Sequence, residues 1–202
     1  EGAGGTAAGY VLDVTDADAI TEVTGRVHRE LGPIDILVNN AGIAVGGPVD
    51  DPDADDHFQL ALDVLLTPHQ RLIRACLDDL RASGEGRIIN ISSTEGLGAS
   101  RGSWPYTTAK HGVIGLTRAM AVALAADGIT VNAVCPGPII TGMTDAIPSE
   151  HRDTFARRRT ALRRYGDPEE VAHMVLNLAL PASSYVTGAA IPVDGGQTMK
   201  ND

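Results

Sequence analysis

Short apolar runs with the length of β-strands alternate along this chain with longer stretches of helical periodicity. The strand-like runs cover residues 9–14, 34–39, 87–92, 129–134 and 190–193. Between them, apolar side chains recur every three or four positions, for example over residues 20–31. Strands that alternate with helices are typical of a parallel sheet covered by helices on both faces. We therefore predict an α/β fold with a doubly wound parallel sheet, three layers and right-handed crossovers.

Capping residues predict where several helices begin and end. Asp51 and Pro52 are a typical N-cap residue and a proline at the first helical position, and they predict a long helix that starts there. A helix over residues 104–126 is expected to be closed by Asp127 and Gly128. A further helix, over residues 167–180, begins with aspartate, proline and a glutamate at its third position.

Composition limits the classes of protein that the chain can represent. A length of 202 residues fits one domain over residues 1–202, with 43% hydrophobic and 21% charged residues as in globular proteins. The formal net charge of −10 repels phosphate backbones and argues against general nucleic-acid binding. The longest uncharged apolar run, residues 119–126, is far shorter than a membrane span, so we expect no membrane partner.

The cysteines and histidines show no spacing that is typical of a metal site. Cys76 and Cys135 lie far apart and form no Cys-x-x-Cys motif, which argues against a zinc site and a disulfide scaffold. The six histidines include no His-x-His or His-x-x-x-His pair. We therefore expect no metal ion and a location in the reducing cytoplasm.

Open parallel sheets bind ligands at the carboxyl ends of their strands. Directly at or after the ends of the predicted strands stand Asp13-Val14, Asn39 to Gly42, Ser92-Ser93 and Cys135 to Gly137. Because these segments meet at one edge of the sheet, we predict that the functional site lies there.

Tyr106 and Lys110 stand four positions apart near the start of a predicted helix, so both lie on one face, one turn apart. A tyrosine that acts as an acid or base must ionise well below its reference pKa of about 10. An ammonium about 4 Å away supplies roughly 4 kcal/mol at an effective dielectric constant near 20, which would bring the pKa to about 7. The pair therefore makes sense as a proton-transfer unit, although the motif alone also fits an ordinary exposed helix turn.

Several motifs occur together in a fixed order over essentially the whole chain. They are Asp13-Val14, Asn39-Asn40-Ala41-Gly42, Ser93, Tyr106-x-x-x-Lys110, Pro136 to Thr141 and Val193-Asp194-Gly195-Gly196. In this order and spacing the chain resembles the short-chain dehydrogenase/reductase family, in its general layout the 3-oxoacyl-carrier-protein reductase branch. The resemblance implies a Rossmann-like fold and an oxidoreductase that interconverts a carbonyl and a secondary alcohol. The implied cofactor is NAD or NADP, and both remain open, as does the small-molecule substrate.

The resemblance implies a catalytic role for three residues. Tyr106 would donate a proton to a carbonyl or take one from an alcohol. Ser93 would hydrogen-bond the same oxygen and hold it within reach of Tyr106. Lys110 would lower the pKa of the tyrosine and hold the ribose hydroxyls next to the nicotinamide.

The resemblance also implies which residues hold the cofactor. Asp13 and Val14 would contact the adenine, and the backbone at Asn40, Ala41 and Gly42 would let the cofactor approach closely. Together with Tyr106 and Lys110, the nicotinamide side would be held by Pro136, Gly137, Ile139 and Thr141. The turn at residues 39–42 can equally stabilise the sheet, and we expect both roles.

One departure from the family pattern concerns a proton relay. The family places asparagine and glycine in the phrase Asp-Val-Asn-Leu-Thr-Gly, where this chain has Leu65 and Pro68. In the family, the backbone carbonyl at the asparagine position holds a water that leads to the catalytic lysine. A backbone carbonyl survives the change to leucine, and Pro68 removes an amide from the helix and frees the Val64 carbonyl. We expect a relay with altered geometry.

A second departure concerns the phosphate loop. The family begins with a strand and the loop Thr-Gly-x-x-x-Gly-x-Gly, which holds the cofactor pyrophosphate at a helix N-terminus, and nothing in this sequence matches it. We expect an N-terminally truncated fold, in which residues 1–5 enter the family's third strand and the first two βα units lie outside the sequence. In the family, the two strands of those units lie between strand 9–14 and strand 34–39. Either residues outside the sequence fill that space, which we favour, or strand 9–14 pairs directly with strand 34–39.

Two further expectations concern partners. The helices over residues 60–80 and 109–126 resemble the family's four-helix subunit contact and carry more apolar residues than one core-facing stripe needs. We therefore expect a homotetramer, with a dimer as the alternative.

The alternative function is a fragment that oligomerises, is non-catalytic and holds no dinucleotide. The arginines at 157–159 and 163–164 fit a solvated helical face, or contact with an acidic carrier protein or a phosphopantetheine group.

Overall fold

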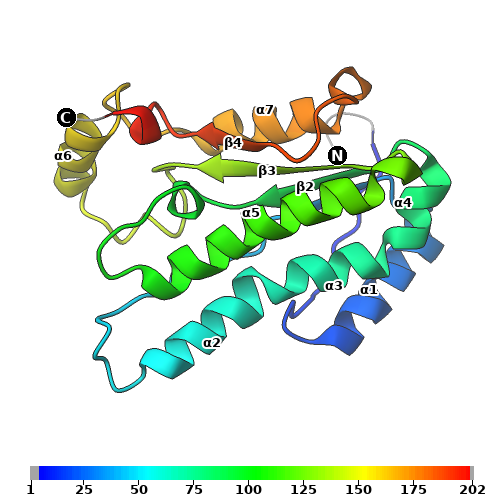
Figure 1. The fold of residues 1–202 in the computed structure, drawn as a ribbon, viewed down its shortest axis with the longest axis horizontal. Helices are drawn as coiled ribbons and strands as arrows, with labels where there is room; N and C mark the ends of the chain where they lie inside the picture. The colour runs from blue at the N-terminus through cyan, green and yellow to red at the C-terminus, as the bar shows by residue number, and fades with distance from the viewer. Residues whose placement is uncertain (1–4, 201–202) are drawn as a thin grey trace.

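Four parallel strands lie side by side in the order in which they occur along the chain (Figure 1). The computed structural model describes residues 5–200, so residues 1–4 of the predicted opening loop lie outside the described part. The strands are β1 (Ile36–Asn39), β2 (Arg87–Ile91), β3 (Thr130–Pro136) and β4 (Ala190–Val193). The α-helices are α1 (Ala17–Leu31), α2 (Ala54–Leu65), α3 (Thr67–Ala75), α4 (Leu77–Ser83), α5 (Trp104–Leu124), α6 (Ser149–Arg159) and α7 (Pro168–Ala179). Short 3₁₀ turns are η1 (Thr94–Gly96), η2 (Ala125–Asp127), η3 (Pro181–Ser183) and η4 (Gln197–Met199).

The register of the sheet places the carboxyl ends of its strands together. Asn39 of β1 pairs with Asn90 of β2, and Asn90 in turn pairs with Ala133 of β3. Strand β4 continues the sheet, with Val193 opposite Pro136. The predicted parallel α/β sheet is confirmed for these four strands, and β4 has the predicted bounds.

Helices cover the two faces of the sheet unequally. Helices α2 to α5 pack on one face, where Ile88 and Val131 of the sheet meet Leu80 and Leu124 in the core (Figure 1). On the opposite face, Leu178 of α7 packs against residues of β2 and β3. Successive side chains of a strand point to opposite faces. Ile88 therefore packs in the core beneath α3 to α5, and its neighbour Ile89 packs in the core beneath α7. The predicted three-layer arrangement follows from this alternation.

The predicted strand over residues 9–14 is wrong. Residues 5–13 have no regular secondary structure, and within residues 5–200 no strand pairs with the outer edge of β1. A strand is defined by hydrogen bonds to a neighbour, and residues 9–14 have none in the sheet, whatever their apolar pattern. Direct pairing between residues 9–14 and 34–39 is therefore not what the structure shows. Ile36 and Val38 of β1 consequently remain 46% and 41% exposed.

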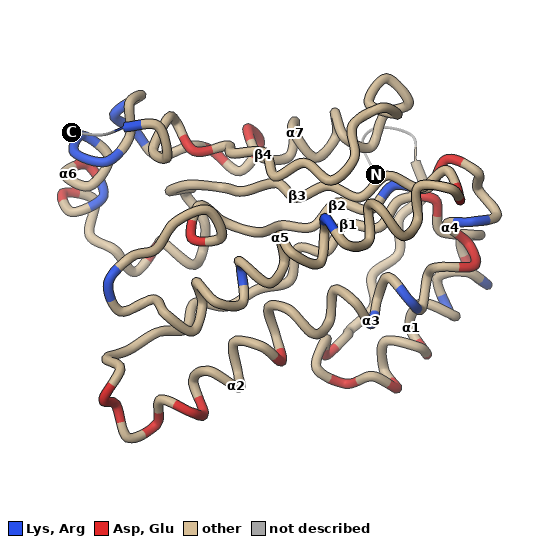
Figure 2. The backbone as a smooth tube through the Cα atoms, viewed as in Figure 1, with Lys and Arg blue, Asp and Glu red and all other residues tan. Residues whose placement is uncertain are grey.

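The helix predicted to start at Asp51 starts later. Asp53 is the N-cap of α2, and the Asp51 carboxylate accepts a hydrogen bond from the Asp53 N–H at 3.0 Å in the turn before it. The single long helix is interrupted at Leu66 and at Cys76, which gives α2, α3 and α4. Two carboxylates in the first turn of α2 favour the positive end of its dipole, and Figure 2 shows this acidic start.

The other predicted caps form as expected. Glu170 accepts a hydrogen bond from the Asp167 N–H at 2.9 Å, which completes the capping box of α7. Gly128 closes the helical segment of α5 and η2 with a left-handed φ of 74°. Because other residues rarely adopt this conformation, glycine is required there.

Helix α6 carries the arginine run that the sequence analysis interpreted as a solvated helical face. Arg157, Arg158 and Arg159 lie exposed in its last turn, and Figure 2 shows positive charge gathered there. The Lys200 ammonium donates to the Arg158 carbonyl at 2.9 Å, so a cation lies at the negative end of the α6 dipole.

Candidate active site

A cavity of about 680 Å³ opens at the carboxyl ends of β1, β2 and β3. It is lined by Asn40, Ala41, Gly42, Ile43, Ile91, Ser92, Ser93, Tyr106, Lys110, Pro136, Gly137, Pro138, Ile139, Thr141, Met143, Thr144, Pro168 and Val171. All three predicted catalytic residues are among them, as are the predicted cofactor residues except Asp13 and Val14. The edge of the sheet that the sequence indicated is therefore where the predicted residues meet.

Ser93 follows β2 and is held in a fixed orientation. It is the N-cap of η1, and its hydroxyl oxygen accepts a hydrogen bond from the Glu95 N–H at 3.1 Å. Ser93 is 8% exposed. The turn can lie this close to α5 only because residue 96 is glycine: a Cβ atom there would stand 2.8 Å from the Lys110 carbonyl oxygen.

Tyr106 and Lys110 lie one turn apart on α5, as the spacing predicts. The Lys110 nitrogen lies 5.6 Å from the centre of the Tyr106 ring. It donates a hydrogen bond to the Ile91 carbonyl oxygen at 2.8 Å, so the ammonium is anchored to the end of β2. In addition, the Ser92 hydroxyl donates to the Lys110 carbonyl at 3.0 Å. Strand β2 and helix α5 are thus joined on both sides of the lysine.

Burial controls the ionisation of both residues. It lowers the pKa of Lys110 to about 8, because a residue that is only 4% exposed keeps its ammonium largely away from water. Burial also raises the pKa of Tyr106 above its usual value, while the hydrogen bond from Ser93 acts in the opposite direction. The Lys110 hydrogen bond is directed to the strand end rather than to the phenol, so any effect of its charge on the pKa of Tyr106 acts across the 5.6 Å between its nitrogen and the ring centre.

The turn at residues 39–42 contacts both the sheet and the main cavity. The Asn39 amide donates to the side chain of Asn90 at 2.8 Å, and Asn90 donates to the Thr117 hydroxyl at 2.9 Å. This buried chain links β1, β2 and α5 and is structural. The next residues, Asn40 and Ala41, face the main cavity instead.

Asp13 and Val14 lie apart from the main cavity. The Asp13 carboxylate accepts hydrogen bonds from the N–H and the hydroxyl of Thr15, at 2.9 and 2.8 Å. Val14 lines a second cavity of about 240 Å³, between residues 12–14 and the outer edge of β1. Asn40 and Ala41 line both cavities, so the two spaces meet at the end of β1. An adenine in contact with Val14 would therefore lie in the second cavity, on the other side of Asn40 and Ala41 from Tyr106.

Sequence reasoning did not single out the apolar wall of the main cavity. Ile43, Met143 and Val171 contribute to it, from the loop after β1, the segment before α6 and helix α7. No sequence signal distinguishes these side chains from ordinary core residues, because their role arises only when three distant segments meet. A partly apolar wall suits the carbon skeleton of an organic substrate.

The donor set of the main cavity fits one half of a nicotinamide dinucleotide. An ammonium at Lys110 and hydroxyls at Ser93 and Tyr106 surround a space that can take a ribose and an amide-bearing ring. The sequence offers no glycine-rich turn before a helix for the pyrophosphate. The residues therefore fit the nicotinamide and its ribose, and we derive no contact to the phosphates.

Comparisons with known proteins agree with this arrangement. The family model described as enoyl-(acyl carrier protein) reductase matches residues 1–198. The 3-oxoacyl-[acyl-carrier-protein] reductase FabG of Thermotoga maritima is 41% identical over 97% of this chain and 79% of that protein. The meso-2,3-butanediol dehydrogenase of Serratia marcescens is 38% identical over 98% of this chain and 77% of that enzyme. A crystal structure of actinorhodin polyketide ketoreductase with NADPH matches with a TM-score of 0.85 and 37% identity, over 92% of this chain and 75% of that one.

The chain belongs to the short-chain dehydrogenase/reductase family, whose members are NAD(P)-dependent oxidoreductases. Within the family it falls in the branch similar to 3-oxoacyl-carrier-protein reductases. The predicted family, fold class, enzyme class and cofactor class are confirmed. No helix within residues 5–200 has the length and apolarity needed to cross a membrane. In the same described range, no group of three or more histidine, cysteine, aspartate or glutamate side chains is arranged to hold a metal ion. Both cysteines are free and buried.

Proposed function

We propose that this protein interconverts a carbonyl and a secondary alcohol on a small organic substrate, with NAD or NADP, and that Tyr106 transfers the proton. The observation that carries the proposal is that Ser93, Tyr106 and Lys110, from three different positions along the chain, line one cavity. Relatives named as an oxoacyl reductase and a butanediol dehydrogenase support this reaction class.

In the proposed mechanism, Tyr106 and Ser93 act on the same substrate oxygen, and Lys110 acts on Tyr106. The Tyr106 hydroxyl gives its proton to the carbonyl oxygen during reduction and takes one from the alcohol during oxidation. The Glu95 N–H occupies an acceptor position of the Ser93 oxygen, and the Ser93 hydroxyl proton, which is directed to Tyr106 in this structure, turns to the substrate oxygen when the substrate is bound. The bound cofactor supplies or accepts the hydride.

Lys110 stabilises negative charge that develops on the Tyr106 oxygen. With a pKa of about 8, the lysine is predominantly protonated at neutral pH, so its positive charge is present when the phenolate forms. In the same proposal Lys110 also holds the nicotinamide ribose. The remaining cofactor contacts that we propose are the adenine contacts Asp13 and Val14, and, around the nicotinamide half, Asn40, Ala41, Gly42, Tyr106, Pro136, Gly137, Ile139 and Thr141.

A second candidate function is an oligomerising, non-catalytic chain that holds no dinucleotide. The exposed outer edge of β1, with which no strand within residues 5–200 pairs, favours it. Calorimetric titration of the full chain with NADH and with NADPH separates the two candidates. Saturable binding of either cofactor supports the oxidoreductase, and heat no larger than dilution supports the alternative.

We further propose a homotetramer, and a location in the cytoplasm that the two free, buried cysteines support. Helices α3 and α5 border an exposed groove that contains Leu66, Gly112 and Gly115. Small residues let two helix pairs approach closely, which supports a contact between copies of this chain there.

The proposal is tested by turnover of the full chain. Purified protein is mixed with NADH or NADPH and a panel of ketones, 3-oxo esters and 3-oxoacyl thioesters, and the loss of reduced cofactor is followed by absorbance. Ser93→Ala should reduce kcat by about 10²-fold or more, because it removes a donor to the reacting oxygen. The matched control Ser184→Ala, far from the cavity in sequence and absent from its lining, should stay within twofold of wild type. Equal rates for the two variants would refute the role of Ser93.

A further inference from the structure

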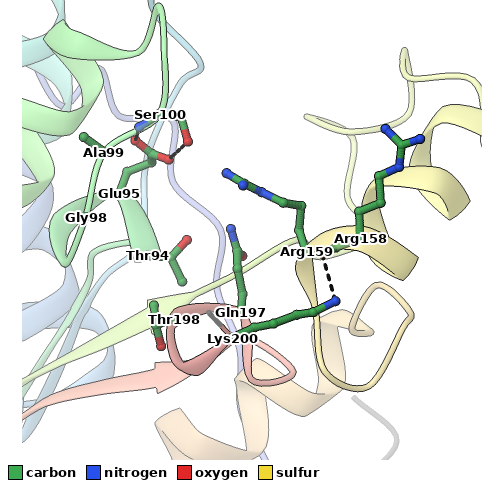
Figure 3. A pocket seen from close by; sticks show the side chains of 10 residues that line it. All are labelled: Thr94, Glu95, Gly98, Ala99, Ser100, Arg158, Arg159, Gln197, Thr198 and Lys200. Carbon is green, nitrogen blue, oxygen red and sulfur yellow. Dashed lines mark hydrogen bonds between the residues drawn. The ribbon is translucent and has the colours of Figure 1, made fainter. Parts of the chain in front are cut away.

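Glu95 contacts both of the segments that carry the hydroxyl groups of the proposed catalytic site. It is the middle residue of the η1 turn, two positions after Ser93. Its carboxylate accepts hydrogen bonds from the Ser100 N–H at 2.9 Å, from the Ser100 hydroxyl, and from the Thr107 hydroxyl at 2.7 Å. Figure 3 shows Glu95 and Ser100 directed toward one another. The family motifs named above do not include Glu95, and the proposed mechanism uses only its backbone N–H.

These bonds join the two segments that carry Ser93 and Tyr106. The backbone N–H of Glu95 binds the Ser93 oxygen, and the side chain of the same residue binds Thr107, the residue next to Tyr106. The loop between them is held as well, because Ser100 gives two of the three hydrogen bonds to the carboxylate. A single side chain thus bridges the end of β2 to the first turn of α5.

The hydrogen bonds to Glu95 are of the kind that resists distortion. An ionised carboxylate accepts shorter and stronger bonds than a neutral group does, and three donors converge on this one. The basic side chains on the other side of the shallow pocket that Glu95 borders are Arg158, Arg159 and Lys200 (Figure 3). Within residues 5–200, none of them lies within ion-pair distance of Glu95, so the carboxylate bonds to its own loop and to α5.

We propose that Glu95 is a positioning residue, whose carboxylate clamps the Ser93 turn to α5 and so fixes the Ser93 hydroxyl relative to the Tyr106 hydroxyl. The inference rests on the proposed function for its catalytic consequence. Its structural part, the clamp itself, stands on the hydrogen bonds of Glu95 alone.

The clamp is tested by removing its link to α5 without touching a catalytic group. Thr107→Val keeps the shape of the side chain and removes the hydroxyl that Glu95 binds. Thr108→Val is the matched control, because the Thr108 hydroxyl bonds only the Trp104 carbonyl within α5 in the described structure. We expect Thr107→Val to lower kcat by about tenfold with KM for the cofactor within twofold, since small displacements of reacting groups are costly. Thr108→Val should stay within twofold of wild type.

A second variant separates the charge of Glu95 from its geometry. In Glu95→Gln the amide oxygen can accept from Ser100 and Thr107, and the amide nitrogen can donate to the Ser100 hydroxyl, so the clamp is retained. The Glu95 charge raises the pKa of Tyr106, and its loss should lower that pKa. The phenol titration of Tyr106, isolated by ultraviolet difference against Tyr106→Phe, should therefore shift to lower pH in Glu95→Gln and stay in place in Thr108→Val. This titration therefore reports the charge of Glu95, whereas the kcat of Thr107→Val reports the clamp.

Two readouts need no turnover, so the clamp and the proposed function can fail separately. Hydrogen exchange of residues 97–103 should accelerate in Thr107→Val relative to Thr108→Val. If wild type turns over no substrate while exchange and titration change as expected, the proposed function fails and the clamp stands. If Thr107→Val and Thr108→Val show the same exchange and the same kcat, the inference is wrong.

Discussion

Lys110 carries a positive charge where water hardly reaches. Its pKa of about 8 lies some 2.5 units below the ordinary value of 10.5. The charged form is therefore disfavoured in the folded state by about 3 kcal/mol, at about 1.4 kcal/mol per pKa unit. This cost is present in full below pH 8, where the folded chain must hold the ammonium, and fades as the pH rises to about 10.5.

Lys110→Met should therefore stabilise the fold while it removes activity. At neutral pH we expect the free energy of unfolding to rise by up to about 3 kcal/mol, and the gain to disappear near pH 10.5. Urea unfolding at a series of pH values measures the gain, and turnover measures the loss. A variant less stable than wild type at neutral pH would show that the charge of Lys110 is compensated by contacts that we have not identified.

His69 is a second buried titratable residue, and it lies outside the main cavity. It is 2% exposed, and within the described chain neither ring nitrogen has a hydrogen-bond partner. Burial lowers its pKa to about 3, with the Lys110 charge adding to the effect. Unfolding therefore takes up a proton at this residue between about pH 6.5 and 3, and each pH unit of acidification costs about 1.4 kcal/mol of stability.

His69→Leu should flatten the acid side of the stability profile. The replacement is apolar, has nothing to protonate, and removes two unpartnered nitrogens from the interior. We expect equal or higher stability at pH 7 and a widening advantage over wild type down to about pH 4, measured by thermal unfolding. The same slope in both proteins between pH 6.5 and 4 would contradict the assignment of this proton uptake to His69.

Individual site residues were more predictable than their ionisation. Ser93, Tyr106 and Lys110 follow from motif spacing, because a strand end and one helix face fix where such residues lie. Their pKa values depend on burial and on which acceptor the lysine reaches, and neither can be deduced from spacing. Asp13 and Val14 were expected at the end of a strand that does not form within residues 5–200, so the apolar pattern could not place them.

At the scale of the elements, the interruption between α2 and α3 is the feature that most shapes the site. Pro68 has no N–H, so the Val64 carbonyl lacks the donor that a continuous helix would give it. The His69 N–H instead bonds the Leu66 carbonyl at 3.2 Å. Leu65, at the end of α2, is fully buried in an apolar cluster with Ala61 and Ala109.

Leu65→Asn, which restores the residue typical of the family, should destabilise this protein. A Cβ atom built on Gly42 would lie 3.5 Å from a methyl group of Leu65, which shows how closely the side chain approaches the turn after β1. An amide placed in this cluster costs about 1–3 kcal/mol if it is left unpaired. We expect a lower melting temperature and no increase in kcat. Increased kcat across the pH range would instead indicate that leucine had impaired a relay.

Prediction of the elements succeeded where the signal is local and failed where it is not. The N-cap Asp167, the first residue Pro168 of α7 and the glycine after η2 act within one turn, so their positions were predicted correctly. The segment 9–14 has an apolar pattern, but a strand also needs a neighbour, which a pattern cannot reveal. The only sequence signal for the break at Leu66 is Pro68. The sequence analysis expected Pro68 to free one carbonyl, but not to divide the long helix into α2 and α3.

At the scale of the whole molecule, the proposed assembly can be tested at one glycine. Gly115 lies exposed on α5, and no heavy atom lies within 4 Å of a Cβ built there. Gly115→Gln should therefore preserve the fold of the single chain, while its added side chain stands in the groove between copies. We expect light scattering to give about four times 21.0 kDa for wild type and a smaller assembly for the variant.

The control for this prediction is Gly9→Gln, a substitution with equally free space away from the helical groove. It should leave the mass unchanged. A wild-type mass of one chain at micromolar concentration would contradict the proposed tetramer, and an unchanged assembly in Gly115→Gln would place the contact elsewhere.

The most direct test of the central claim is the effect of removing one hydroxyl group from the cavity. Tyr106→Phe deletes the proposed proton carrier, and Tyr165→Phe, at a tyrosine outside the cavity lining, is the control. With saturating cofactor and substrate, we expect kcat to fall by about 10²–10⁴-fold for Tyr106→Phe, while its melting temperature and its affinity for the cofactor stay close to those of wild type. A kcat within a few-fold of that of Tyr165→Phe would contradict the assignment of Tyr106 as the catalytic acid and base.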